Sequence, residues 1–229
     1  MFVYSLAGLT IEGQDSQEAV ELPDNATTSR LGVYQAMARL LTRPDADSHA
    51  AAVAGEWPAR LAADAKLLPF TFDFGIGSIP PATSAEEFHA EYLRLFDDGT
   101  VKNSSGAPLY GGAYGSGDRA QKLEEVVRFY DYFGLHASPE DQRPADHLCT
   151  ELEFMKYLTF KEAVTKSARL QPSFRRAQHD FLDRQIGLWL PQLVQKIGAV
   201  EPLAFWKWAV ATVSAFASAD AAYLQSDVA

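Results

Sequence analysis

Three short motifs between residues 91 and 155 decide the fold of this chain: Glu91-Tyr92-Leu93-Arg94-Leu95-Phe96, Pro108-Leu109-Tyr110-Gly111-Gly112-Ala113-Tyr114, and Asp146-His147-Leu148-Cys149-Thr150-Glu151-Leu152-Glu153-Phe154-Met155. The first motif closes a predicted helix, the second connects two helices, and the third opens a helix. Gly111 and Gly112 allow positive φ, so the sequence predicts a tight loop lined by aromatic side chains between the helices.

The composition describes a folded and acidic protein. Of the 229 residues, 47% are hydrophobic and 12% aromatic, which is enough for a buried core and excludes general disorder. The net charge of −10 disfavours a nucleic-acid partner, because phosphate backbones bind basic surfaces. An acidic surface suits a basic peptide partner, although the same charge can serve solubility alone.

Cysteine usage and hydropathy predict a cytoplasmic protein. Cys149 is the only cysteine, so the chain forms no internal disulfide and no cysteine-rich zinc site. The apolar start, Met1 to Leu9, lacks the basic residues of a signal peptide. No uninterrupted apolar run approaches the ~18 residues of a membrane span.

Helix signals recur along the chain and predict an all-α fold. Ser84 and Glu87 form a capping box, Gly134 is placed as a helix stop, and Pro144 suits the first position of the helix that carries Asp146. Pro191 is expected to kink or interrupt a later helix. We expect an N-terminal arm over residues 1–24, mobile in part, and one helical bundle of roughly seven or more helices over residues 25–229.

Residues 67–81 are the one segment with strand-like alternation. Phe70, Phe72 and Phe74 alternate there, and glycines and prolines follow. A single short run without a partner cannot form a sheet. We therefore expect a buried loop laid across helices.

The helix after Pro144 carries the polar residues most suited to a site. His147 and Glu151 are four residues apart and share a face at the edge of the core, and Asp146 falls in the first turn. A structural interpretation has Asp146 cap the helix while His147 and Glu151 pair with each other. A functional interpretation places all three in a binding or catalytic site.

A metal site is the chemical alternative. A helical metal-dependent hydrolase or lyase would use Asp146, His147 and Glu151, since the last two have ligand spacing. A di-iron bundle needs two Glu-x-x-His motifs, however, and the chain has only Glu86-Glu87-Phe88-His89. The His-Glu-x-x-His motif of zinc peptidases is absent. We predict no catalytic residue, no metal and no enzymatic activity.

Together the three motifs resemble the TorD/DmsD/NarJ family of molybdoenzyme maturation chaperones. The Pro-x-Tyr-Gly-Gly loop at Pro108 and the Asp-His-x-x-x-Glu helix start at Asp146 carry the likeness, which extends over about residues 25–220. Many TorD-like members have Glu-Ser before the loop tyrosine, where this chain has Gly112-Ala113. That departure favours the chaperones of the type II dimethyl sulfoxide reductase family.

The resemblance implies a cytosolic, non-enzymatic chaperone of all-α fold. Its partner would be the apo catalytic subunit of a molybdenum enzyme, held for cofactor insertion before twin-arginine export, often through its signal peptide. The client would carry the molybdenum cofactor and the chaperone none of its own; guanine nucleotide binding is a further possibility. The client-binding and signal-peptide-binding residues would be Glu91, Tyr92, Tyr110, Gly111, Gly112, Tyr114, Asp146, His147 and Glu151.

Overall fold

The computed structural model is described here for the larger part of the chain. The described residues are 2–3, 9–11, 19–20, 22–73, 75, 84–96, 106–115, 117–137 and 143–226. Phe74, which the sequence assigned to the loop, lies outside them, as does most of the predicted N-terminal arm.

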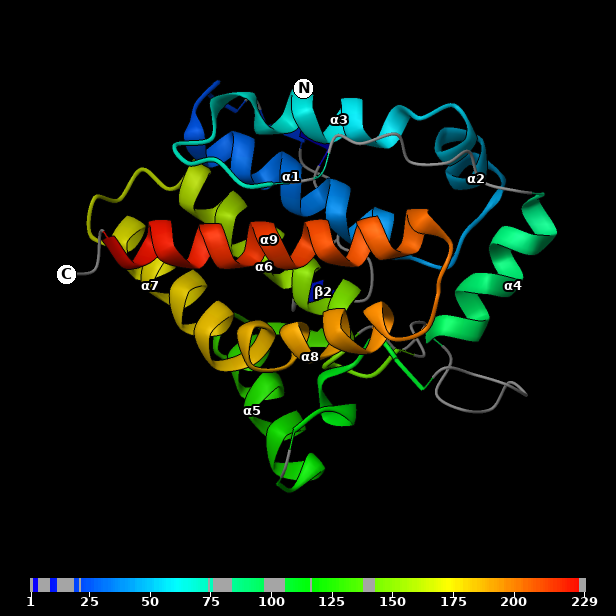
Figure 1. Ribbon diagram of the computed structural model, residues 1–229. Coiled ribbons are helices and arrows are strands. Elements are labelled where there is room, and N and C mark those ends of the chain that lie inside the picture. The colour runs from blue at the N-terminus through cyan, green and yellow to red at the C-terminus, as the bar shows by residue number, and fades with distance from the viewer. Residues whose placement is uncertain are drawn as a thin grey trace.

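Within these residues the fold is an all-α bundle, as the sequence predicted (Figure 1). The α-helices are α1 (Ala26–Leu40), α2 (Ala46–Val53), α3 (Glu56–Asp64), α4 (Ala85–Phe96), α5 (Arg119–Tyr132), α6 (Leu148–Val164), α7 (Leu170–Phe181), α8 (Gly187–Gly198) and α9 (Ala204–Ser226). Two 3₁₀ turns, η1 (Ala65–Leu67) and η2 (Gly111–Ala113), and a π-helical segment, η3 (Leu182–Ile186), complete the helical elements. None of the described helices is long and apolar enough to cross a bilayer.

Helix α6 is the centre of the bundle. It packs against α1 and α7, and α9 crosses the same region (Figure 1). Its buried residues include Leu148, Leu152, Met155 and Thr159, and also Cys149. Since neighbours surround α6, its polar side chains are buried as well, including Glu151, which the sequence had placed at the edge of the core.

Local capping explains where several helices begin. Asn25 and Asp118 accept backbone N–H groups at the starts of α1 and α5, and these bonds satisfy donors that a helix leaves free. The capping box of Ser84 and Glu87 is confirmed by both of its bonds. Gly134 follows α5 with φ of 67°, which confirms it as a helix stop.

The start of α6 differs from the prediction. The helix begins at Leu148, with His147 as its N-cap, rather than at Pro144. Residues 145–148 are drawn into contacts with the Pro108–Tyr114 loop, where the Leu148 N–H donates to the Leu109 carbonyl at 2.7 Å. Asp146 therefore lies in front of the helix and not in its first turn.

Pro191 was expected to kink or interrupt its helix, and the interruption is not observed. Helix α8 runs through Pro191, and the irregular turn is the π-helical segment η3, which ends at Ile186. A Cβ on Gly187 would lie 2.7 Å from the Leu182 carbonyl oxygen, so the wide turn requires glycine there. The segment joins α7 to α8 and rotates the later side chains relative to α7.

Short strands occur that the sequence did not predict. Strand β1 (Phe2–Val3) pairs with β3 (Ala19–Val20), and β2 (Leu9–Ile11) pairs antiparallel with β4 (Leu135–Ala137). Leu9 is buried by the second pair. The β2–β4 ladder attaches the beginning of the chain to the segment after α5, whereas β1 and β3 pair within the first 20 residues.

The aromatic run at residues 67–81 forms no strand in its described part, as expected, but it is not the buried loop that the sequence predicted: Phe70 and Phe72 are only half-buried, and Thr71 between them is exposed. Phe70 lies 6.0 Å and Phe72 5.3 Å, between ring centroids, from Phe216 of α9. Phe70 also lies 5.5 Å from Tyr223. The segment therefore covers α9 with aromatic rings.

A buried ion network joins four helices. The guanidinium of Arg30, on α1, is fully buried and donates to Asp220 on α9 at 2.5 and 2.8 Å. It also donates to Glu162 on α6 at 3.2 Å and to Gln178 on α7 at 2.5 Å. Arg175 provides a second cation to Glu162 at 2.8 Å, so two cations face two carboxylates.

We predict that Arg30→Ala lowers the free energy of unfolding by about 3–5 kcal/mol, because it leaves buried carboxylates without their cation. Arg128→Ala, which breaks an exposed pair with Glu124, should cost less than about 1 kcal/mol. Urea denaturation of both variants measures the difference. Equal costs would show that the buried network does not stabilise the bundle.

Candidate functional site

The site is built where the Pro108–Tyr114 loop meets the start of α6. Tyr110 and His147 form an antiparallel bridge, and the Gly111 N–H donates to the Asp146 carbonyl at 2.9 Å. The Tyr114 hydroxyl donates to the Pro108 carbonyl at 2.8 Å and so closes the loop on itself. Two motifs separated by more than thirty residues thus form one unit.

The two loop glycines serve close approach rather than positive φ. Gly111 and Gly112 form η2, and the positive φ of this region lies at Gly115, at 74°. A Cβ on Gly111 would come within 3.0 Å of the Trp189 ring. On Gly112 it would lie 2.9 Å from the Asp146 carboxylate. The predicted reason for these glycines was wrong, although the predicted tight loop is present.

Asp146 contributes a carboxylate with one free oxygen. Its Oδ2 accepts the Gly112 N–H at 2.6 Å. Its Oδ1 is buried and has no hydrogen-bond partner. A buried acceptor without a partner is costly and is rare in folded proteins, so it marks a place where a ligand can donate.

His147 and Glu151 take separate partners and do not pair with each other. The Nδ1 atom of His147 accepts the Cys149 N–H at 3.2 Å and so caps α6. Glu151 Oε2 accepts the indole N–H of Trp189 at 3.2 Å. The structural interpretation, in which Asp146 caps the helix and His147 pairs with Glu151, is therefore incorrect.

An aromatic wall stands beside these carboxylates. The rings of Tyr114 and Trp189 are stacked, with centroids 5.3 Å apart and planes inclined by 21°. The ammonium of Lys196 lies 4.9 Å from the Tyr114 ring centroid, and Lys122 donates to the Tyr114 carbonyl at 3.0 Å. Contacts from the loop, α5 and α8 therefore hold the two stacked rings in place.

Burial raises the pKa of the Glu151 carboxyl well above its ordinary value, and the neighbouring charge of Asp146 raises it further. The hydrogen bond from the Trp189 N–H lowers the pKa of this carboxyl, but by less than burial raises it. Glu151 therefore holds a proton more readily than an exposed glutamate does. In its neutral form it can donate a hydrogen bond as well as accept one.

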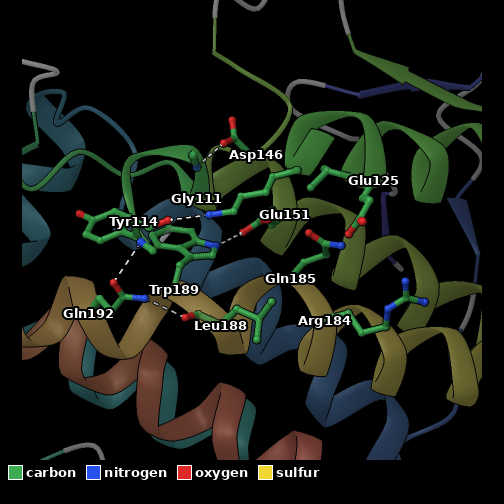
Figure 2. A pocket seen from close by; sticks show the side chains of 14 residues that line it. Gly111, Tyr114, Glu125, Asp146, Glu151, Arg184, Gln185, Leu188, Trp189 and Gln192 are labelled. Carbon is green, nitrogen blue, oxygen red and sulfur yellow. Dashed lines mark hydrogen bonds between the residues drawn. The ribbon is translucent and has the colours of Figure 1, made fainter. Parts of the chain in front are cut away.

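A cavity of about 220 Å³ opens among these groups (Figure 2). Asp146 and Glu151 lie at one side of it, Trp189 and Tyr114 at another, and Gln185 of η3 completes it. The Gln185 side-chain nitrogen is buried and has no partner, like Asp146 Oδ1. The further lining residues are Gly111, Gly112, Gly115, Lys122, Glu125, Val126, Arg184, Leu188 and Gln192.

Four of the nine predicted site residues do not line the cavity. Tyr110 and His147 lie beside it, in the bridge between the loop and the start of α6, whereas the other two lie elsewhere. Tyr92 is buried in α4 and donates its hydroxyl to the Leu41 carbonyl at 3.1 Å. Glu91 pairs with Arg94 and accepts the Leu203 N–H at 3.0 Å, just before α9. Neither residue lines the cavity, and both hold α4 against its neighbours.

The residues that the sequence reasoning missed come mainly from η3, α8 and α5. Trp189, Gln185 and Lys122 carried no local motif that would have placed them beside Asp146. Trp189 lies near the start of α8. Its role depends on the π-helical segment, which no simple sequence pattern predicts.

The metal alternative finds no ligand set in the described part of the chain. No group of three or more His, Cys, Asp or Glu side chains gathers there as metal ligands. The Asp146, His147 and Glu151 side chains are instead directed to Gly112, Cys149 and Trp189, respectively.

Comparison with known proteins assigns the family. Residues 45–195 match the model of the family described as nitrate reductase delta subunit. Because this match covers well over half of the 229 residues, the chain belongs to that family, and the resemblance to the TorD/DmsD/NarJ group is confirmed. No solved structure matches the chain significantly.

Three relatives illustrate the likeness. The selenate reductase assembly chaperone protein of Thauera selenatis is 38% identical over 127 residues, covering 55% of this chain and 65% of the relative. The chlorate reductase assembly chaperone protein of Ideonella dechloratans is 34% identical over 186 residues, covering 79% and 82%. The perchlorate reductase assembly chaperone protein of Dechloromonas aromatica is 31% identical over 191 residues, covering 80% and 84%.

The raised pKa of Glu151 predicts a pH-dependent stability. The folded state keeps a proton that the unfolded chain releases near pH 4.5, so this group destabilises the fold progressively as pH rises above that value. Glu151→Gln keeps an acceptor for Trp189 and cannot ionise. We expect the variant to gain stability relative to wild type at pH 8 and to lose that gain near pH 4.5, as measured by urea denaturation. A pH-independent difference would contradict the assignment.

Proposed function

We propose that this protein is an assembly chaperone for the catalytic subunit of a molybdenum enzyme. In this proposal it binds the cofactor-free subunit in the cytoplasm and holds it for insertion of the molybdenum cofactor before twin-arginine export. The working part is the helical domain of residues 25–229, and residues 1–24 are its N-terminal arm. Family membership and three relatives named as assembly chaperones support the role.

The observation that carries the proposal is the free oxygen of Asp146 at the cavity. A basic side chain of the client is the donor that this oxygen lacks, and a charge-assisted hydrogen bond there is stronger than a neutral one. The stacked rings of Tyr114 and Trp189 offer a face to a guanidinium group. Arginine is therefore the client residue that best fits the cavity, as in the paired arginines of a twin-arginine signal peptide.

In this proposal the remaining predicted residues position the loop and the start of α6, and they need not contact the client themselves. Gly111 and Gly112 let the loop lie against Trp189 and Asp146, and His147 fixes the first turn of α6. Tyr110 lies beneath the Arg119 guanidinium, which is 4.7 Å from its ring centroid. Glu91 and Tyr92 are assigned to the packing of α4, not to client binding.

Charge favours encounter with a basic segment. The net charge of −10 attracts a basic peptide over a distance that salt screens, so the association rate should fall as ionic strength rises. In this proposal the chaperone has no cofactor of its own, because the client carries the molybdenum. That the client is an enzyme of the type II dimethyl sulfoxide reductase family stays a prediction, and so does the binding of guanine nucleotide.

Asp146→Asn tests the proposal with little change to the fold. The asparagine carbonyl can still accept the Gly112 N–H, while its amide replaces the free carboxylate oxygen. The variant is co-expressed with the catalytic subunits of selenate, chlorate or perchlorate reductase, and the molybdenum content of each subunit is measured. We expect wild type to raise the content of at least one subunit and Asp146→Asn to lower that gain at least about tenfold.

Glu86→Gln, an exposed change on α4, is the matched control and should retain full loading. Circular dichroism and urea denaturation should show both variants folded. Full loading with folded Asp146→Asn would reject the cavity as the working site. Equal loading with and without the wild-type chain, for all three subunits, would reject the function for these clients.

A further inference from the structure

A second hollow lies on the outer side of the bundle, between α5 and α7. It is a groove of about 860 Å³, and aromatic rings form its floor. Phe133, the C-cap residue of α5, and Phe174 of α7 meet across it with ring centroids 6.0 Å apart, and Phe129 packs on the core residue Phe181 at 5.1 Å. The floor is thus a continuation of the core that the bundle leaves open.

Large apolar side chains also stand on the edges of this α5–α7 groove. Tyr132 is 84% exposed and Leu170 49% exposed, and both line it. Isolated exposed apolar residues are ordinary, but here they join a part-buried aromatic floor into one patch. Such a patch between two helices suits the apolar face of a third helix.

The charges around the groove oppose the charge of the whole protein. Arg128, Arg176 and Arg184 line it, against two carboxylates, Glu125 and Asp180. The net charge of the chain is −10, so this excess of cations is local.

Two of these arginines have no carboxylate partner among the described residues. Arg176 is exposed, and no carboxylate of the described residues pairs with its guanidinium. The Arg184 guanidinium lies 5.8 Å from the Phe129 ring centroid. Arg128 pairs with Glu124 at 2.6 Å, but both side chains are mostly exposed, so an incoming carboxylate can compete at small cost.

The groove is continuous with the cavity. Glu125 and Arg184 line both, one from α5 and one from η3. The two sites differ in chemistry, however. The cavity offers a free carboxylate oxygen for a basic side chain, whereas the groove offers an aromatic floor with arginines at its rim.

We propose that the α5–α7 groove docks an amphipathic helix of the client that has an apolar face and acidic flanks. This inference rests on the proposed function for the source of the helix, and it adds a second contact point of opposite charge preference. The apolar face would cover Phe129, Tyr132 and Phe174, and carboxylates of the helix would meet Arg128 and Arg176. An anionic membrane would also meet arginines, but the apolar residues lie in a hollow between two helices, which suits a helix better than a flat lipid surface.

Two synthetic helical peptides test the groove directly. They share one leucine-rich face and differ only in their flanks, which are glutamates in one and lysines in the other. Calorimetric titration of the full chain should show the glutamate peptide binding about tenfold more tightly, with the difference reduced at high salt. Equal binding, or tighter binding of the lysine peptide, would overturn the proposal.

Variants locate the binding on the groove. Tyr132→Ser combined with Leu170→Ser should weaken the glutamate peptide at least about tenfold, since both remove exposed apolar contacts. Arg128→Glu combined with Arg176→Glu should reverse the preference between the peptides. Lys207→Glu, an exposed charge reversal on α9, is the matched control and should leave both affinities unchanged. Unchanged binding by the two folded double variants would place the peptide elsewhere and reject the groove.

Other occupants are separate outcomes of the same experiment. Analytical ultracentrifugation showing a dimer that Tyr132→Ser with Leu170→Ser dissociates would assign the groove to a second copy of the chain and overturn the proposal. Co-sedimentation with vesicles of phosphatidylserine, lost in the arginine variant, would likewise overturn it. Failure of the peptides to bind while Asp146→Asn still abolishes client loading would reject the groove and leave the proposed function intact.

Discussion

The buried guanidinium of Arg30 is the constraint on which the bundle depends. It is fully removed from water, so its charge must be matched inside the protein. The matching groups lie 190 residues away at Asp220, 132 away at Glu162 and 148 away at Gln178. Only one arrangement of α1, α6, α7 and α9 brings these side chains together. Apolar contacts do not depend on direction, so they are compatible with many compact arrangements of the helices. The hydrogen bonds of the Arg30 network depend on distance and angle, so small displacements of these helices would break them.

The same network positions the functional cavity from a distance. Glu162 lies in the last turns of α6, and Glu151 lies in its first turn, about 16 Å away at the rise of an α-helix. One end of α6 is thus fixed by ions and the other end receives the Pro108–Tyr114 loop. A site that rests on a fully enclosed helix keeps its geometry more accurately than one built on loops alone. The loop contributes the glycines, the segment just before α6 contributes Asp146, and the helix itself contributes Glu151.

Two surfaces of unlike chemistry meet at Glu125 and Arg184. The cavity contains buried polar atoms without partners, which cost free energy in the empty protein. The groove exposes aromatic surface, which is also unfavourable in water. In the proposed function, a partner that covers both sites would recover these two costs. Opposite charge preferences at adjacent sites would reject peptides that carry only one kind of charge, and specificity of this kind needs no additional contacts.

The sequence by itself determined the helical fold, the Ser84 capping box, the helix stop at Gly134 and the tight loop after Pro108. These depend on periodicity, capping and turn chemistry, which act over a few residues. The tertiary structure alone decided that Asp146 precedes the helix, that Glu151 is enclosed beside Trp189, and that Glu91 and Tyr92 serve packing. It also set Gln185 at the cavity through the π-helical turn. In each case, side chains far apart in the sequence compete for the same buried volume and the same hydrogen-bond partners. A local sequence pattern does not show which of them will meet.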